Sequence, residues 1–211
     1  MPRVLFVWGG WEGHTPRESV EVFAPWLAQQ GFEVLLRDEL AAFDDLELLR
    51  ACDLIVPCWT LGELSAAQER NLCDIVADGC GLAGWHGGMG DAFRANTQYQ
   101  YMVGGQFVAH PGDILDRWTV RIVDHEHYIT RGLGDFEMHD TERYYLHVDP
   151  GNHVLAATTI AQGCEMPVCW VRRWGRGRVT YLSVGHTWRD FDVQPARTMM
   201  QRCLLWATRQ A

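Results

Sequence analysis

The first 90 residues alternate between short apolar runs and longer amphipathic stretches. Apolar runs of strand length occur at residues 4–8, 32–36 and 54–56. Between them, apolar residues recur at helical spacing after Thr15 and after Ser65. A strand, helix, strand order at this spacing is typical of βαβ units. We therefore expect a parallel sheet with right-handed crossovers in this part of the chain.

Both helical stretches begin with a capping-box sequence. Thr15 is followed three residues later by Glu18, and Ser65 is followed three residues later by Gln68. In such a box the first side chain accepts a hydrogen bond from the backbone of the third helical residue. Pro16 at the first helical position supports the earlier start. The sequence therefore predicts side-chain caps at residues 15 and 65.

The pattern is weaker after residue 90. We expect a helix over 91–101, a loop over 106–112, a strand over 119–123, strands over 144–148 and 154–157 that pair with each other, a hairpin of 168–172 with 178–184, and a closing helix over 195–207. The chain contains no repeat, low-complexity segment or linker. We expect one domain over residues 1–211: a doubly wound α/β fold with a mostly parallel sheet and helices on both faces.

Composition and charge narrow the classes of function. The chain has 211 residues and a formal net charge of −9. This charge argues against nucleic acid or an anionic membrane as a partner, because both require a basic patch. The start of the sequence has no secretory pattern, and no apolar run approaches the roughly 18 residues of a membrane span. Seven cysteines without a C-x-x-C pair indicate reduced thiols, so we expect a cytoplasmic protein.

The densest motif is the glycine-rich stretch of residues 81–90. Its spelling Gly84-x-His86-x-Gly88 has the form of a nucleophile elbow, in which a strand turns sharply into a helix. A side chain at the tip is exposed in the crevice at the carboxyl end of a parallel strand. His86 at that tip could bind a metal, move a proton or hydrogen-bond a substrate. A glycine-rich turn with an incidental histidine is the competing interpretation.

Other histidines follow predicted strands. His14 comes after the first strand and His186 after the last, while His110 lies in a loop flanked by glycine and proline. Because strand ends on one edge converge, we expect these three side chains to surround one crevice with His86. Taken singly, each is more often structural or exposed. His125-Glu126-His127 lacks the spacing of a helical zinc motif and remains a weak candidate.

Carboxylates and aromatic residues complete the candidate set. Asp140 and Glu142 would point the same way on an extended segment, and one of them could orient a histidine. A surface acidic pair is the alternative. Trp11 and Trp85 lie beside glycine or histidine at predicted strand ends, where their rings could stack on a sugar. Core packing is the commoner use of tryptophan.

Six ordered blocks of the chain resemble the trehalose-utilisation ThuA-like family. They are Gly13-His14, the Gly-Leu-Ala-Gly-Trp-His-Gly of residues 81–87, residues 101–111 ending in His-Pro, residues 124–133, the Glu-Arg-Tyr of residues 142–144, and residues 167–186 ending in Gly-His. Tyr128 stands where the family usually has proline. The resemblance covers nearly the whole chain and implies the fold of the class I glutamine amidotransferase domain.

The resemblance also implies a role in sugar metabolism. It implies a carbohydrate substrate, such as a keto-sugar derivative of a disaccharide or glycoside. It implies no glutamine amidotransferase activity, because His86 stands at the nucleophile position, and His186 lies near the catalytic histidine of that fold. Some relatives carry a metal at this site.

Two hypotheses follow. In the first, the protein is an isomerase, lyase or hydrolase acting on a 3-keto glycoside, with His86, His186 and Glu142 as catalytic groups. His14, Trp11, Trp85 and His110 would bind the substrate. His86, His110 and His186 would hold a divalent metal, Zn²⁺ or Mn²⁺, and no nucleotide is expected. In the second, the chain is a sugar-binding or sensing module without turnover. We also expect a homodimer or a higher homo-oligomer.

Overall fold

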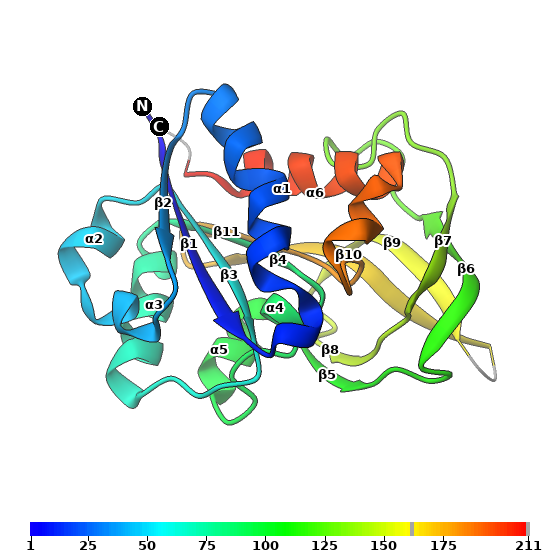
Figure 1. The fold of residues 1–211 in the computed structure, drawn as a ribbon, viewed down its shortest axis with the longest axis horizontal. Coiled ribbons are helices and arrows are strands. Elements are labelled where there is room, and N and C mark those ends of the chain that lie inside the picture. Colours follow the sequence, from blue (N-terminus) through cyan, green and yellow to red (C-terminus); the bar gives the residue numbers. More distant parts are fainter. Residues whose placement is uncertain (161–162, 210–211) are drawn as a thin grey trace.

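The computed structural model describes residues 1–160 and 163–209 (Figure 1). The strands are β1 (Arg3–Gly10), β2 (Glu33–Arg37), β3 (Leu54–Thr60), β4 (Gly81–Trp85), β5 (Gly105–Ala109), β6 (Ile114–Ile122), β7 (Phe136–Glu142), β8 (Tyr145–Val148), β9 (His153–Ile160), β10 (Cys164–Trp174) and β11 (Gly177–Leu182). The α-helices are α1 (Pro16–Gln29), α2 (Leu46–Arg50), α3 (Ala66–Ala77), α4 (His86–Gly90), α5 (Thr97–Val103) and α6 (Gln194–Ala207). The 3-10 helices are η1 (Glu12–His14), η2 (Leu40–Asp44) and η4 (Trp188–Asp192).

One large sheet organises the molecule. Its strand order is β2-β1-β3-β4-β11-β10-β9-β6-β7. Pairing is parallel from β2 to β11 and antiparallel from β11 to β7. The expected α/β fold is confirmed, and the sheet is mixed because the chain returns through hairpins after β5. The parallel half carries the βαβ units that the apolar runs predict.

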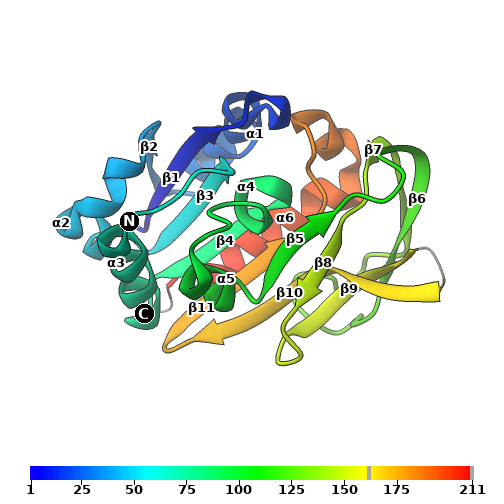
Figure 2. The ribbon, with the colours of Figure 1, turned by 90° about the horizontal axis from the view of Figure 1, so that it is seen from below.

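Strand alternation gives the sheet two cores. Val4 and Phe6 of β1 lie in the core under α1 and α6, whereas Leu5 and Val7 lie in the core under α2, α3 and α5. Figure 2 shows these two helical layers on opposite sides of the sheet. A strand buried on both faces needs a continuous apolar run, which is what residues 4–7 provide. None of the helices in the described residues combines the length and apolar character that a membrane crossing requires.

The two predicted helix caps differ in outcome. Ser65 forms the full capping box with Gln68 at the start of α3, as predicted. Thr15 does not cap α1: its φ is 46°, and its hydroxyl accepts a hydrogen bond from the Trp188 amide at 3.1 Å. The prediction at Thr15 was wrong because a contact with a distant loop takes the side chain that a local cap would use.

The predicted pairing of residues 144–148 with 154–157 is also wrong. β8 pairs with β5 in a separate two-stranded ribbon, and β9 pairs with β10 and β6. The connecting turn is held elsewhere, because the Asp149 amide and the Asn152 side chain both donate to the Gly104 carbonyl. Residues 106–109, expected in a loop over 106–112, therefore belong to β5. The helix expected over 91–101 begins later, at Thr97.

Candidate functional site

Residues 81–90 form the predicted strand-turn-helix elbow. β4 ends at Trp85, α4 begins at His86, and His86 has a φ of 41°. A non-glycine residue in this left-handed region is held there by its surroundings. A Cβ atom on Gly87 would lie 2.3 Å from Cε1 of His14. Glycine at position 87 therefore lets a second imidazole approach the elbow.

Four side chains meet at the elbow. Each of His14, His86, Glu142 and His186 offers one nitrogen or oxygen atom, and these atoms all lie within 4.8 Å of one another. The three histidines follow β1, β4 and β11, which are parallel strands whose carboxyl ends share one edge. Glu142 comes from the carboxyl end of β7, at the far side of the sheet. Three of the four histidines expected around one crevice are thus in one cluster.

The hydrogen bonds of His86 determine where its proton lies. Nδ1 is 2.8 Å from the Ser183 carbonyl oxygen, which can only accept, so Nδ1 carries the hydrogen. Nε2 lies 3.1 Å from Oε2 of Glu142. In a neutral imidazole with hydrogen on Nδ1, Nε2 is a lone pair that faces a carboxylate oxygen. These two acceptors can therefore share one cation, either a proton or a metal ion.

His14 is held as a neutral imidazole. Its Nδ1 lies 2.7 Å from the Thr60 hydroxyl, and its ring lies 4.8 Å from that of His86 and 5.2 Å from that of His186. Burial, followed by the neighbouring His86 and His186, lowers the pKa of His14 to about 2. A permanently neutral imidazole suits hydrogen bonding or metal ligation rather than proton carriage at neutral pH.

Glu142 is held as a carboxylate. Burial raises its pKa, but the adjacent imidazoles of His186 and His86 lower it more, so its pKa lies well below the usual range. Nδ1 of His186 is 3.4 Å from Oε2 of Glu142, yet it is buried without a hydrogen-bond partner among the described residues. An orphaned imidazole nitrogen beside a carboxylate and two more imidazoles fits a divalent cation, because these are the donors that first-row metals prefer.

A cavity of about 190 Å³ opens next to the cluster. Aromatic and polar side chains from several elements line it: Trp11, His14, Thr60, Leu61, Asp91, Arg94, Phe107, His110, Glu142 and Tyr144. Phe107 of β5 contributes to this lining, and β5 packs against α4 (Figure 2). The Tyr144 ring stacks on His86 with centroids 3.8 Å apart, and Arg94 forms two hydrogen bonds with Asp91. The cavity therefore offers ring faces and hydrogen-bonding groups together.

Three further predicted site residues differ in their position relative to the cavity. Trp85 is buried against Phe23 and Phe191 on the opposite face of the sheet, because side chains alternate along β4, so its ring cannot stack on a substrate. His110 lines the cavity but is not one of the four clustered residues, because it follows β5 of the ribbon rather than a strand of the main sheet. Trp11 lines the cavity and is 49% exposed.

The elbow histidine is more enclosed than the sequence predicts. Only 1% of the His86 surface is exposed, because Tyr144 and Glu142 cover the ring. Glu142 itself is buried, whereas Asp140, the other member of the acidic pair, is exposed. Of the two carboxylates, Glu142 is the one that belongs to the site.

Sequence reasoning missed six of the lining residues as binding candidates: Thr60, Leu61, Asp91, Arg94, Phe107 and Tyr144. Thr60 ends β3 and Leu61 follows it, so the rule that parallel strand ends converge could have included both. The other four depend on the path of the chain after α4 and on the pairing of β5 with β8. The local sequence pattern does not predict the pairing of β5 with β8.

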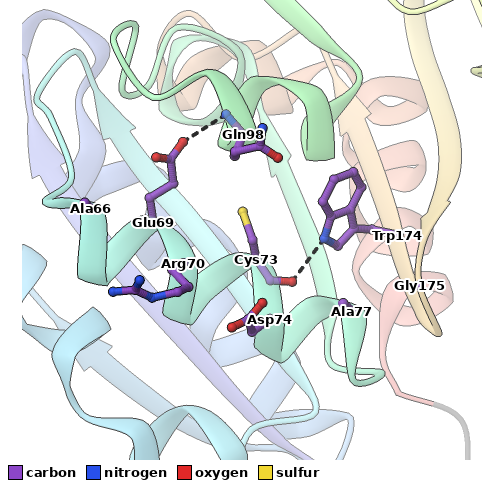
Figure 3. Close-up of a pocket in the computed structure, with 9 residues that line it drawn as sticks. All are labelled: Ala66, Glu69, Arg70, Cys73, Asp74, Ala77, Gln98, Trp174 and Gly175. Carbon is purple, nitrogen blue, oxygen red and sulfur yellow. Dashed lines mark hydrogen bonds between the residues drawn. The ribbon is translucent and has the colours of Figure 1, made fainter.

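A larger hollow of about 510 Å³ lies away from the histidines, between α3, the start of α5 and Trp174 (Figure 3). Two of its polar side chains, Glu69 and Trp174, already have hydrogen-bond partners. The Glu69 carboxylate accepts from the amides of Gln98 and Tyr99, and the Trp174 indole donates to the Cys73 carbonyl. Size alone therefore does not make this hollow the chemical site, and the smaller cavity beside the clustered imidazoles is the better candidate.

Comparisons with known proteins agree with the sequence resemblance. A family model named ThuA and described as trehalose utilisation matches residues 3–207. Among curated protein sequences, none matches the chain at a significant level.

Similar folds occur among solved structures. A ThuA-like protein of Parabacteroides merdae is 15% identical, with a TM-score of 0.80 over 98% of this chain and 90% of that one. A protein of Salmonella typhimurium described as cytoplasmic is 15% identical, with a TM-score of 0.72 over 98% of this chain and all of that one. A β-galactosidase of G. stearothermophilus is 17% identical, with a TM-score of 0.58 over 86% of this chain but 27% of the enzyme. At these identities the likeness concerns the fold.

Proposed function

The chain belongs to the ThuA family of trehalose utilisation, and from this premise we propose that it is an enzyme of carbohydrate metabolism. Its substrate is a sugar oxidised to a ketone, such as a 3-keto glycoside. The reaction is an isomerisation or a β-elimination that begins with removal of a proton next to the carbonyl. The observation that carries the proposal is the approach of His86 Nε2 to Glu142 Oε2 at 3.1 Å, inside a cluster of three imidazoles.

The cavity beside the cluster suits one sugar ring. Its volume of about 190 Å³ equals the share of about six water molecules in the liquid. Phe107 and the partly exposed Trp11 offer ring faces to the apolar side of a sugar. Thr60 and the Asp91–Arg94 pair offer hydrogen bonds to its hydroxyl groups. A second ring of a glycoside would lie outside, beside Trp11 and the exposed Leu61.

Proton transfer is assigned to the clustered groups. Glu142 lines the cavity and contacts His86, so a proton removed from the substrate carbon passes to the Glu142 oxygen and is shared with His86 Nε2. The electrons of the broken C–H bond move onto the carbonyl oxygen as an enolate. In a β-elimination this enolate collapses and expels the glycosidic oxygen, which takes a proton from His186. In an isomerisation the proton returns to the neighbouring carbon.

In place of the shared proton, the same four residues also fit a divalent cation, and Zn²⁺ and Mn²⁺ are our first choices. His14, His86, His186 and Glu142 would hold it, in the protonation states that metal binding requires. When bound, such an ion acts as a Lewis acid that polarises a substrate carbonyl. His110 is left for the sugar, since it lines the cavity outside this set.

Glutaminase chemistry is not part of the proposal. The tip of the elbow is an imidazole, and Cys58 and Cys80 are buried. Burial raises the pKa of both thiols to about 12, the opposite of what a nucleophilic thiolate needs.

The deciding experiment is incubation of the purified protein with a panel of 3-keto glycosides, with products followed by mass spectrometry. We expect cleavage or isomerisation of at least one compound, and no change in the matching glycosides that lack the ketone. A binding or sensing module would retain the sugar without turnover. Binding without product across the panel, with and without added Zn²⁺ or Mn²⁺, would overturn the enzyme proposal in favour of that module.

A further inference from the structure

Residues of β6 and β9 contribute to a second polar hollow. These strands lie near the edge of the sheet that β7 forms (Figure 1). The hollow has a volume of about 420 Å³. Arginine and threonine side chains dominate its lining: Arg117, Thr119, Arg121, Arg143, Thr158 and Thr159. The alternating residues 118, 120 and 122 of β6 belong to the core under α1 and α6, so the two arginines of β6 lie on the opposite face.

Arg143 is the least compensated charge in this hollow. Its side chain is partly buried, and one of its guanidinium nitrogens donates to the Thr159 carbonyl at 3.0 Å. Among the described residues, no carboxylate lies within 4.0 Å of it, and its Nε is buried without a hydrogen-bond partner. Burial lowers the pKa of Arg143. A partly desolvated cation without a counter-ion is costly, which points to a missing anionic partner.

The other two arginines of the hollow have carboxylate partners. Arg117 lies 3.6 Å from Glu137, and Arg121 forms an ion pair with Glu165. Asp135 also lines the hollow, but its carboxylate accepts a hydrogen bond from the Ile122 amide. Arg143 is thus the one guanidinium of the lining that has no carboxylate within 4.0 Å among the described residues, in a chain whose net charge is −9. Any attraction of an anion would therefore come from this hollow, because the protein as a whole is negatively charged.

We propose that this hollow binds the phosphate group of a small phosphorylated molecule or free phosphate itself. A guanidinium offers parallel N–H donors that match phosphate oxygens, and the Thr119 hydroxyl can donate as well. The volume lies in the range of small-molecule pockets and exceeds what one phosphate fills, so a phosphorylated metabolite is the expected occupant. Because Arg143 follows Glu142 directly, the site lies behind the segment that carries the carboxylate of the histidine cluster.

Binding tests this proposal without any measurement of activity. Calorimetric titration with inorganic phosphate and with glucose 6-phosphate, at fixed ionic strength, should show saturable binding of both. Tighter binding of glucose 6-phosphate assigns the site to a phosphorylated metabolite, whereas equal affinity assigns it to the phosphate group alone. Arg143→Gln should weaken binding by about 10- to 100-fold, the value of a lost charge-assisted hydrogen bond. Arg37→Gln, an equal change of charge at the opposite edge strand β2, should bind like the parent.

Arg121→Gln provides a second variant at a more exposed position, in case Arg143→Gln does not fold. It should also weaken phosphate binding while retaining the parent's melting temperature in chloride. Three results would overturn the proposal: no phosphate binding by the parent, equal weakening in Arg37→Gln, or binding of citrate but not of phosphate.

Discussion

A comparison of two groups of histidines with a carboxylate, both within the described residues, shows what makes a site. The first is the cluster of His14, His86, His186 and Glu142. The second lies on the loop after β6, where Asp124 is 2.9 Å from Nε2 of the exposed His153. The ring of His127 lies 5.7 Å from that of His153. Residue types alone do not separate the two groups.

Their hydrogen bonds do separate them. In the loop, Asp124 accepts from the amides of Glu126 and His127, and Nδ1 of His127 accepts from the Ile129 amide. These polar atoms hold the backbone of their own turn, as such side chains commonly do. In the cluster, His186 Nδ1 has no hydrogen-bond partner among the described residues, and His86 Nε2 faces a carboxylate. Unsatisfied groups that converge on one point, rather than histidine content, mark the chemical site.

The largest expected effect is the loss of turnover in His86→Asn. Asparagine tolerates the φ of 41° and can still donate to the Ser183 carbonyl, so the fold should persist. Loss of the proton carrier should lower the rate of keto-glycoside conversion by ~10²- to 10⁴-fold. Product formation and melting temperature should be measured together. His125→Asn, at an exposed loop position, is the matched control and should behave as the parent.

The second prediction concerns metal binding. After chelator treatment, added Zn²⁺ or Mn²⁺ should raise the melting temperature of the parent. At a metal concentration of 100 times the dissociation constant, the free energy of unfolding should increase by about 2.7 kcal/mol. His186→Asn should lose most of this response because it removes one of the four donors. His153→Asn should keep it. An unchanged response in His186→Asn would place the metal elsewhere, and no response in the parent would leave the histidines as acid–base groups alone.

The third prediction concerns the pH dependence of stability in the chelated protein. The pKa of His14 is about 2 when folded but close to 6.5 when unfolded, so the unfolded state binds the proton first as pH falls. Stability should therefore decrease below about pH 6.5, by at most about 1.4 kcal/mol per pH unit from this residue. Glu142 adds a loss only below its ordinary pKa, because its folded pKa is also lowered.

Urea unfolding between pH 7 and pH 5 separates these two contributions. His14→Asn should flatten the slope in this range, whereas the exposed His147→Asn should leave it unchanged. A parent slope that survives in His14→Asn would show that other groups cause it.

The smallest effect is expected for His153→Asn. It removes the contact with Asp124, but the histidine side chain is 56% exposed, and exposed ion pairs contribute little. We expect a stability change below about 1 kcal/mol and no change in turnover. Thermal melting and the keto-glycoside assay would check this. A large loss of activity here would show that the loop group is not merely structural and would erase the contrast between the two groups.

Local signals in the sequence were sufficient where a feature depends on neighbouring residues. The apolar runs at residues 4–8 and 54–56 specify strands buried on both faces, and the glycines around His86 specify the elbow. The Ser65 cap needs only Gln68 three residues later. Convergence of His14, His86 and His186 also follows from sequence, because parallel strands bring their carboxyl ends to one edge.

Features that depend on distant partners were decided by the tertiary structure. Thr15 uses its hydroxyl for the amide of Trp188, 173 residues away, rather than for its own helix. Trp85 faces the core under α1 and α6. Side chains alternate along β4, so the residue before His86 points to the other side of the sheet. Glu142 reaches the histidines from β7, at the far edge of the sheet. Side-chain periodicity says which residues share a face, but the pairing of strands far apart in sequence, and hence the carboxylate opposite His86, is settled only when the whole sheet packs.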